Sequence, residues 1–349
     1  MDYFSGYIGT YTQGVIGRGK GIYAFTLSAE NGVLEDLCLV AESDNPSYLA
    51  LSASKKYLYA VNEIDGFNGK ASGAVSAFAV SEKNGDLTFL NQKSSGGKSP
   101  CHIALNGKSS HAIVSNYMSG NIGVFPIKID GFLEESCQII QFHGSGPNKE
   151  RQERSHAHFF MFDKDYSRGF ACDLGADRVN IYSFDEKTST PLKEISSFAS
   201  DSGAGPRHAL FHPDGKGIYV LNELTSSIDV IYEKKRQTVR TLPEGYSLNN
   251  TTAAIKISPC GRFLYASNRG HDSIAVFKVL EDGSLRFLDA IPSGGNTPRD
   301  FAVDPSGNFL LVCHQDSDNL VIFNIDKDTG FFRKAYEYAI PSGVCIIFT

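Results

Sequence analysis

The stretch GPRHALFHPDGKGIYVLNE, from Gly205 to Glu223, decides the fold of this chain. It joins two apolar runs through a Pro-Asp-Gly turn and ends in a polar Asn-Glu pair. Two further copies run from Thr251 to Arg269 and from Thr297 to Gln315. A unit of roughly 50 residues that recurs along a chain is typical of a propeller or a solenoid.

Each unit reads as a set of short strands. In the clearest copy, Ala209–Phe211 forms the first apolar run, the turn lies at Pro213–Gly215, and Ile218–Leu221 forms the second run. A third run, Ile228–Tyr232, alternates weakly, and a fourth strand is less regular. Proline, aspartate and glycine favour tight turns between strands. Four-stranded units of this length predict propeller blades, since helical repeats would need long stretches with a 3.6-residue period.

The number of copies predicts the number of blades. The residues that open the first strand of each copy are Pro46, Pro100, Ala157, Pro206, Thr252, Pro298 and Pro341. The seventh copy holds one strand, Val344–Phe348, and the N-terminal part of the chain supplies three more, at Tyr3–Gly9, Gly21–Leu27 and Leu37–Glu42. We therefore expect an all-β, seven-bladed β-propeller over residues 1–349, a single domain. Its ring is closed by a C-terminal strand that joins N-terminal strands in one blade, which protects the strand edges.

Composition excludes several classes of protein. The chain is 41% hydrophobic and 21% charged, as soluble globular proteins are, and its formal net charge of −6 argues against nucleic-acid binding. We find no membrane-spanning stretch and no signal segment. The seven cysteines are odd in number and form no CxxC pair, which indicates a reducing cytoplasm. We expect a monomer or a weak homo-oligomer, without membrane or nucleic-acid partners.

Polar residues gather where the first two strands of each blade meet. The first strand of a blade lines the central channel, so residues after its start and after the end of the second strand should surround one channel mouth. The first set is Cys101, His102, His158, Arg207, His208, Arg299 and Asp300; the second is Asn62, Glu63, Asn116, Tyr117, Asp173, Leu174, Asn222, Glu223, Asn268, Arg269, His314 and Gln315.

These residue types suit an anionic oxygen compound. Arg207 and Glu223 flank one hairpin and are expected to approach each other, while Arg269 comes from the next blade. His156 and His158 alternate on one strand and therefore share a face. Arginine can bind a carboxylate or phosphate, or stabilise an oxyanion, and a glutamate or histidine can take a proton from water.

Structural roles compete with these readings. The asparagines at the strand ends are typical of blade-capping hydrogen bonds, and an Arg–Glu pair can be a structural salt bridge. The two histidines could bind a metal, although no third ligand has a recognisable spacing. The glycine-rich segment Gly17–Gly21 lacks the strand-to-helix context of a phosphate-binding loop and reads as a flexible loop.

Motifs along the whole chain resemble one known family. They include YIGTYT at Tyr7–Thr12, SHAH at Ser155–His158, GPRH at Gly205–His208 and SNRGHDSI at Ser267–Ile274. The chain thus resembles the seven-bladed propeller lactonases, which include the bacterial propeller-type 6-phosphogluconolactonases and are related to carboxy-muconate cyclases.

The resemblance implies an active site and a reaction. The implied catalytic residues are Glu223, His158, Arg207 and Arg269, with substrate contacts expected from Arg299, His156, His208, Glu63, His102, Tyr117 and Gln315. The implied activity is hydrolysis of 6-phospho-glucono-1,5-lactone to 6-phosphogluconate, a step of glucose metabolism in the oxidative pentose phosphate pathway. Water would attack the lactone carbonyl with Glu223 or His158 as base, and no metal or organic cofactor is implied.

Other functions stay open at this point. The substrate could be another sugar or organic-acid lactone, the reaction could be a cyclisation, or the propeller could bind a partner without catalysis. Two positions depart from the repeat: Thr251 and Thr252 replace an expected proline, and His314 replaces asparagine. The inserted loop Phe142–Glu153 is expected to act as a lid or rim, or to be an ordinary mobile loop, and Pro243–Asn250 is a second insertion.

Overall fold

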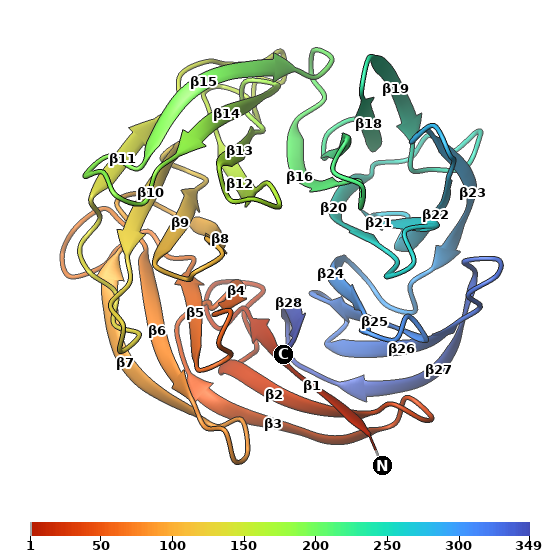
Figure 1. The fold of residues 1–349 in the computed structure, drawn as a ribbon. Coiled ribbons are helices and arrows are strands. Elements are labelled where there is room, and N and C mark those ends of the chain that lie inside the picture. The colour runs from red at the N-terminus through yellow and green to blue at the C-terminus, as the bar shows by residue number, and fades with distance from the viewer. Residues whose placement is uncertain (1) are drawn as a thin grey trace. The chain divides into compact units, whose positions relative to one another are not determined.

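The computed structural model describes residues 2–349 and contains seven four-stranded antiparallel sheets, with no helix among those residues (Figure 1). The seven blades predicted from the repeat are confirmed. The chain divides into two compact units: the first comprises residues up to Leu39 together with His208–Thr349, and the second comprises Val40–Arg207. Strands β3 and β16 each cross a unit boundary. The organisation of residues 1–349 as a single domain stays a prediction.

The first unit holds the larger number of sheets. Their strands are β28 (Gly343–Phe348), β1 (Tyr3–Thr10), β2 (Gly21–Ser28) and β3 (Leu34–Glu42); β16 (Pro206–Phe211), β17 (Gly217–Asn222), β18 (Ser227–Tyr232) and β19 (Lys235–Arg240); β20 (Thr251–Ile257), β21 (Phe263–Arg269), β22 (Ser273–Val279) and β23 (Leu285–Pro292); β24 (Pro298–Val303), β25 (Phe309–His314), β26 (Asn319–Ile325) and β27 (Phe332–Ala339).

The second unit holds the remaining three sheets. Their strands are β4 (Tyr48–Leu51), β5 (Tyr57–Asn62), β6 (Ala74–Val80) and β7 (Leu87–Ser94); β8 (Pro100–Leu105), β9 (His111–Asn116), β10 (Asn121–Pro126) and β11 (Gln138–Gln141); β12 (Ala157–Phe162), β13 (Arg168–Asp173), β14 (Arg178–Phe184) and β15 (Leu192–Ala199).

The sheet that unites the two ends of the chain forms as predicted. Strand β28 pairs antiparallel with β1, with Ile346 opposite Ile8, and β1 continues into β2 (Figure 1). Both isoleucines are buried in the core between this sheet and the β24–β27 sheet. The C-terminal strand therefore covers the edge that β1 would otherwise expose.

The apolar runs that define the repeat become the buried cores between neighbouring sheets. Tyr219 of β17 is fully buried, and its hydroxyl donates to the Gly283 carbonyl of the next sheet at 2.9 Å. Tyr265 makes the same contact with Gly330 at 3.0 Å. A buried hydroxyl thus joins each of these sheets to the next.

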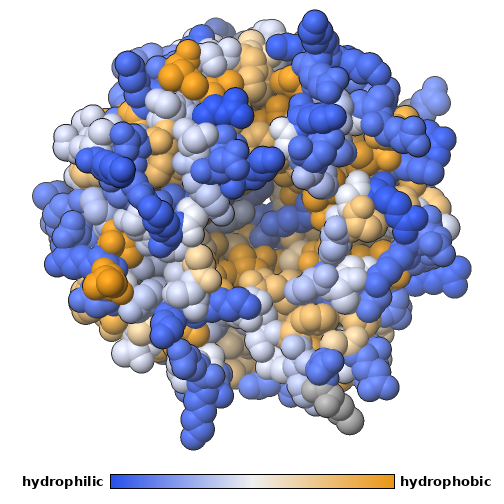
Figure 2. Space-filling model, viewed as in Figure 1, coloured by the Kyte–Doolittle hydropathy of each residue, from blue (hydrophilic) through white to orange (hydrophobic). Residues whose placement is uncertain are grey.

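On the face drawn in Figure 2, hydrophilic residues cover most of the surface, with small groups of hydrophobic residues between them.

Removing one of these hydroxyls tests its contribution. Replacing Tyr219 with phenylalanine should lower the free energy of unfolding by about 1 to 2 kcal/mol, because the buried Gly283 carbonyl loses its donor. Urea unfolding would measure this change. Replacing Tyr3 with phenylalanine is the control, since that side chain is exposed. Equal stability of the Tyr219→Phe protein and the wild type would contradict this role.

An irregularity recurs in the first strand of several blades. His158 is the extra residue between the register pairs Ala157–Asp173 and Phe159–Cys172, and Arg299 is the extra residue at the same point of β24. Cys101 occupies this place in β8. A β-bulge re-aims the side chain of its extra residue, so this position differs from the strict alternation of a regular strand.

Aspartates at a second recurring position fix the start of the following blade. Asp177 and Asp272 directly precede the third strands β14 and β22 and adopt φ of 51°. Asp177 Oδ1 accepts the Gly205 N–H at 2.8 Å, and Asp272 Oδ1 accepts the Thr297 N–H at 2.9 Å. Each acceptor thus holds the residue just before a Pro-Arg pair, Pro206–Arg207 or Pro298–Arg299.

Candidate active site

Two of the predicted site residues, Glu223 and Arg269, contact each other. Glu223 follows β17 and is 3% exposed, and Arg269 is the last residue of β21. Arg269 Nη2 lies 3.2 Å from Glu223 Oε1 and also donates to the Thr252 carbonyl at 2.8 Å. The contact with Arg269 fixes the position of this carboxylate, as the role of a general base requires.

Arg299 lies in the neighbouring sheet of the same unit. Its guanidinium carbon stands 4.9 Å from the centre of the Tyr11 ring, and its Nη1 donates to Gln315 Oε1 at 3.2 Å. Tyr11 and Gln315 are buried, whereas Arg299 is partly exposed. This arrangement holds a cation in one orientation while leaving part of its surface accessible.

A second group of predicted residues forms around Tyr117 in the other unit. The His156 ring stacks on the Tyr117 ring at 4.5 Å, and His158 meets its edge at 5.6 Å. His156 Nδ1 lies 3.0 Å from the Tyr117 carbonyl oxygen and Nε2 lies 3.1 Å from Glu153 Oε2. The two contacts, one at each ring nitrogen, hold the imidazole in one orientation. We therefore interpret His156 as a residue that holds Tyr117 in place.

His158 lies in β12 of the second unit, and Arg207 is the last residue of that unit, in the strand β16 that crosses the boundary. His158 is 6% exposed, and its backbone carbonyl accepts a contact from Cys101 Sγ at 3.4 Å. Arg207 is buried at the second position of β16, after the Gly205 amide that Asp177 holds. The approach of Arg207 to Glu223 stays a prediction.

The remaining predicted residues have backbone or core contacts. His102 is buried between Tyr48 and Phe159, with ring centroids at 4.3 and 4.1 Å, and its Nδ1 accepts the Phe160 N–H. His208 is buried in β16. The Glu63 backbone exchanges hydrogen bonds with Asn45. Substrate contacts from His102, His208 and Glu63 stay predictions, and the ring contacts of His102 indicate a role in packing.

His314 is fully buried and lies at the end of β25, at the place that asparagine occupies in the second strands β17 and β21. Its Nδ1 donates to the Asn319 carbonyl at 3.3 Å, while Asn268 donates to the Thr241 carbonyl at 2.9 Å in the preceding sheet. Burial lowers the pKa of His314 to about 4, so the ring is neutral at physiological pH. The departure from asparagine at this position therefore lies in the blade core.

Two loops that the sequence suggested to be flexible make several defined contacts. Gln152 is fully buried and donates to the Leu174 carbonyl at 2.9 Å and to Asp177 Oδ1 at 2.6 Å. In the N-terminal loop, Arg18 Nε pairs with Asp318 Oδ2 at 2.5 Å. The segments Phe142–Glu153 and Gly17–Gly21 are thus fastened to the sheets beside them.

Several residues beside the candidate site were absent from the sequence prediction. Glu153 contacts His156, and the hydrogen bond from that ring lowers the pKa of the Glu153 carboxyl. Arg151 Nη2 donates to the Tyr117 hydroxyl at 3.2 Å, and Tyr11 supports Arg299. A Glu three residues before His156 was a visible signal, but the contact of Tyr11 with Arg299 had none, since the two lie far apart in sequence.

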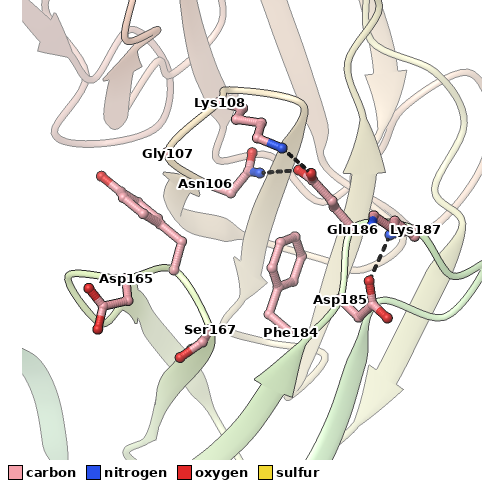
Figure 3. A pocket seen from close by; sticks show the side chains of 10 residues that line it. Asn106, Gly107, Lys108, Asp165, Ser167, Phe184, Asp185, Glu186 and Lys187 are labelled. Carbon is pink, nitrogen blue, oxygen red and sulfur yellow. Dashed lines mark hydrogen bonds and ion pairs between the residues drawn. The ribbon is translucent and has the colours of Figure 1, made fainter.

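A separate groove lies at the turns of the second unit (Figure 3). Its volume is about 620 Å³, and it is lined by Asn106, Gly107, Lys108, Asp165, Tyr166, Ser167, Phe184, Asp185, Glu186 and Lys187. Figure 3 shows Lys108 and Asn106 pointing toward Glu186, which lies 2.5 Å from Lys108 Nζ and 3.3 Å from Asn106 Nδ2. No predicted site residue lines this groove, and Lys108 and Glu186 on its wall form an ion pair.

Comparison with known proteins decides the family. The model of the family "Lactonase, 7-bladed beta-propeller" matches residues 5–348. The chain belongs to this lactonase family. Its seven four-stranded sheets are accordingly the seven blades of a β-propeller. Within residues 2–349 we find no helix that could cross a membrane, and the described residues contain no cluster of three or more His, Cys, Asp or Glu side chains suited to a metal ion.

Individual relatives of this lactonase include proteins with assigned activities. The chain is 36% identical to the 6-phosphogluconolactonase of Bacillus subtilis, over 74% of this chain and 72% of the relative. The structure of a Lactobacillus plantarum protein matches with 33% identity and a TM-score of 0.90, covering both chains fully. The periplasmic gluconolactonase of Pseudomonas aeruginosa matches with 28% identity and a TM-score of 0.92, over 99% of each chain.

Proposed function

We propose that this lactonase hydrolyses 6-phospho-glucono-1,5-lactone to 6-phosphogluconate, the second step of the oxidative pentose phosphate pathway. The contact between Glu223 and Arg269 carries this proposal, because it places a carboxylate beside a fixed guanidinium. Similarity to the Bacillus subtilis 6-phosphogluconolactonase supports the choice of substrate. A carboxylate that accepts a proton from water and a cation that stabilises an oxyanion are the two requirements of lactone hydrolysis.

In the proposed mechanism, Glu223 takes a proton from a water molecule as the water oxygen bonds to the lactone carbonyl carbon. Arg207 or Arg269 stabilises the oxyanion of the tetrahedral intermediate. The bond from the carbonyl carbon to the ring oxygen then breaks, and the ring oxygen receives the proton that Glu223 holds. The product carboxylic acid releases its remaining proton to the solvent, which leaves an open-chain carboxylate and a hydroxyl group. His158 is the alternative base.

Arg299 is the proposed binding group for the phosphate. Arg269 contacts Glu223 and the Thr252 carbonyl, and Arg299 is a partly exposed residue that contacts Tyr11 and Gln315. A planar guanidinium can donate two parallel hydrogen bonds to phosphate oxygens. We therefore place Arg269 at the lactone carbonyl group and Arg299 at the phosphate group.

Proton release from freshly prepared 6-phosphogluconolactone tests this function against the spontaneous background. We expect the wild type to accelerate hydrolysis and the Arg207→Ala protein to lose about a hundredfold in kcat, as loss of an oxyanion donor does. Replacing Arg236 with alanine is the matched control, since that arginine is exposed on β19 of the same sheet. Absence of acceleration by the wild type would overturn the proposal.

The Pseudomonas aeruginosa relative suggests a second candidate substrate, gluconolactone without a phosphate. Running both lactones in the same assay separates the two candidate substrates.

For the compartment we propose the cytoplasm, because all seven cysteines are free thiols and Cys172, Cys313 and Cys345 are buried in strands. Free thiols persist where the medium is reducing.

A further inference from the structure

The contacts around Arg299 indicate how its orientation is set. Its guanidinium lies over the Tyr11 ring, whose electron-rich face attracts a cation. A guanidinium carries five N–H donors in its plane. One of them is taken by Gln315 Oε1 at 3.2 Å. An aromatic ring and an amide oxygen thus both hold this side chain.

Gln315 is itself oriented by a neighbour. Its Nε2 donates to Asp316 Oδ1 at 3.0 Å, which turns the amide oxygen toward Arg299. Asp316 in turn accepts the Thr297 hydroxyl at 2.5 Å, and Thr297 directly precedes the Pro298–Arg299 pair. The amide therefore has one defined orientation, with its acceptor toward the cation.

Two hydrogen bonds fix the backbone of Tyr11. Its N–H donates to the Ser342 carbonyl at 3.0 Å, and its carbonyl accepts the Gly19 N–H at 2.8 Å. Arg18, next to Gly19, donates to the Gln315 carbonyl at 2.9 Å and pairs with Asp318. The loop after β1 thus ties Tyr11 to the same segment that carries Gln315.

We propose that Tyr11 is a positioning residue that sets Arg299 for the phosphate of the substrate and so determines selectivity for the phosphorylated lactone. This inference rests on the proposed function. An arginine that is already ordered loses less conformational freedom when it binds an anion, so its support raises affinity. The ring of Tyr11 carries this role, so phenylalanine can replace it and leucine cannot.

The test compares 6-phosphogluconolactone with gluconolactone as substrates of the same protein. For Tyr11→Leu we expect KM for the phosphorylated lactone to rise about fivefold to tenfold with little change in kcat. Kinetics with gluconolactone should stay unchanged. Tyr11→Phe should keep the wild-type KM, because phenylalanine keeps the aromatic face. Tyr23→Leu is the matched control, since it removes a tyrosine ring from β2, which pairs with the strand that directly precedes Tyr11.

Two results would overturn the proposal. One is that Tyr11→Leu keeps the wild-type preference for the phosphorylated lactone, and the other is that its activity falls equally with both lactones. If Tyr11→Leu does not fold, Gln315→Leu removes the second support of Arg299 and should raise the same KM. An unchanged KM in that protein would count equally against the proposal.

Failure of the proposed function would be distinguishable from failure of this inference. If the wild type hydrolysed neither lactone, calorimetry with 6-phosphogluconate and gluconate would measure the phosphate preference directly. The role of Tyr11 would be supported, independently of the proposed function, if the wild type bound 6-phosphogluconate more tightly than gluconate. Tyr11→Leu should lose this difference and Tyr11→Phe should keep it. Equal binding of the two compounds by the wild type would overturn it.

Discussion

Replacing Glu223 with glutamine is expected to lower kcat for 6-phosphogluconolactone about a thousandfold, within the range for loss of a general base. Glutamine keeps the size of the side chain and can still accept a hydrogen bond from Arg269, so KM should change little. Steady-state proton release over a range of substrate concentrations separates the two constants. The effect is large because an amide cannot take the proton that water must lose.

The control for this change is Glu194→Gln, which removes an exposed carboxylate from β15 and should leave kcat as in the wild type. Unchanged kcat in Glu223→Gln would remove Glu223 from the mechanism and give the proton transfer to His158. A rise in KM alone would instead assign Glu223 to substrate binding.

Acidification is expected to destabilise the protein through His314. The pKa of this ring is about 4 in the folded protein, because of burial, against 6.5 in an exposed histidine. Between these two values the unfolded chain binds a proton that the folded chain does not, so stability falls as the pH drops from 6.5 to 4. The loss is about 3 kcal/mol over this window, since one pKa unit corresponds to about 1.4 kcal/mol.

The His314→Asn protein should lack this part of the acid dependence. Asparagine fills the equivalent strand end at Asn222 and Asn268, so the substitution suits the site. Urea unfolding at several pH values between 4 and 7 gives the slopes, with exposed His143→Asn as the control. Asp272 and Glu337 also act on the His314 ring and remain in both proteins. Equal slopes for His314→Asn and the wild type would contradict the assignment.

The sequence was sufficient to predict the sheets because each blade is built from local signals. Apolar runs and the turn glycines Gly215, Gly261 and Gly307, all at φ between 72° and 75°, follow from nearest-neighbour chemistry. The closing sheet followed from counting strands, since a seventh copy with one strand requires three others. β1 begins at Tyr3 and β2 at Gly21, as predicted.

The candidate site was less predictable because its supports come from distant parts of the chain. Strand alternation gives no sign of the β-bulge that re-aims Arg299, and no spacing rule connects Tyr11 with it. The hydrogen bond from Gly205 to Asp177 links residues that a repeat comparison treats as separate blades. Glu153 and Arg151 were within a segment read as an insertion, where composition says little about which side chains are held.

The pairing of β28 with β1 has a consequence for the timing of folding. During synthesis, β1 to β3 leave the ribosome before the other strands, and their sheet lacks its fourth strand until β28 emerges. The β1 edge is therefore an open template for strand addition throughout translation, which makes it a site for misassembly between nascent copies. Supplying Gly343–Phe348 as a separate peptide to a chain shortened by that strand would be expected to restore its fold, as one chain completes the sheet of another.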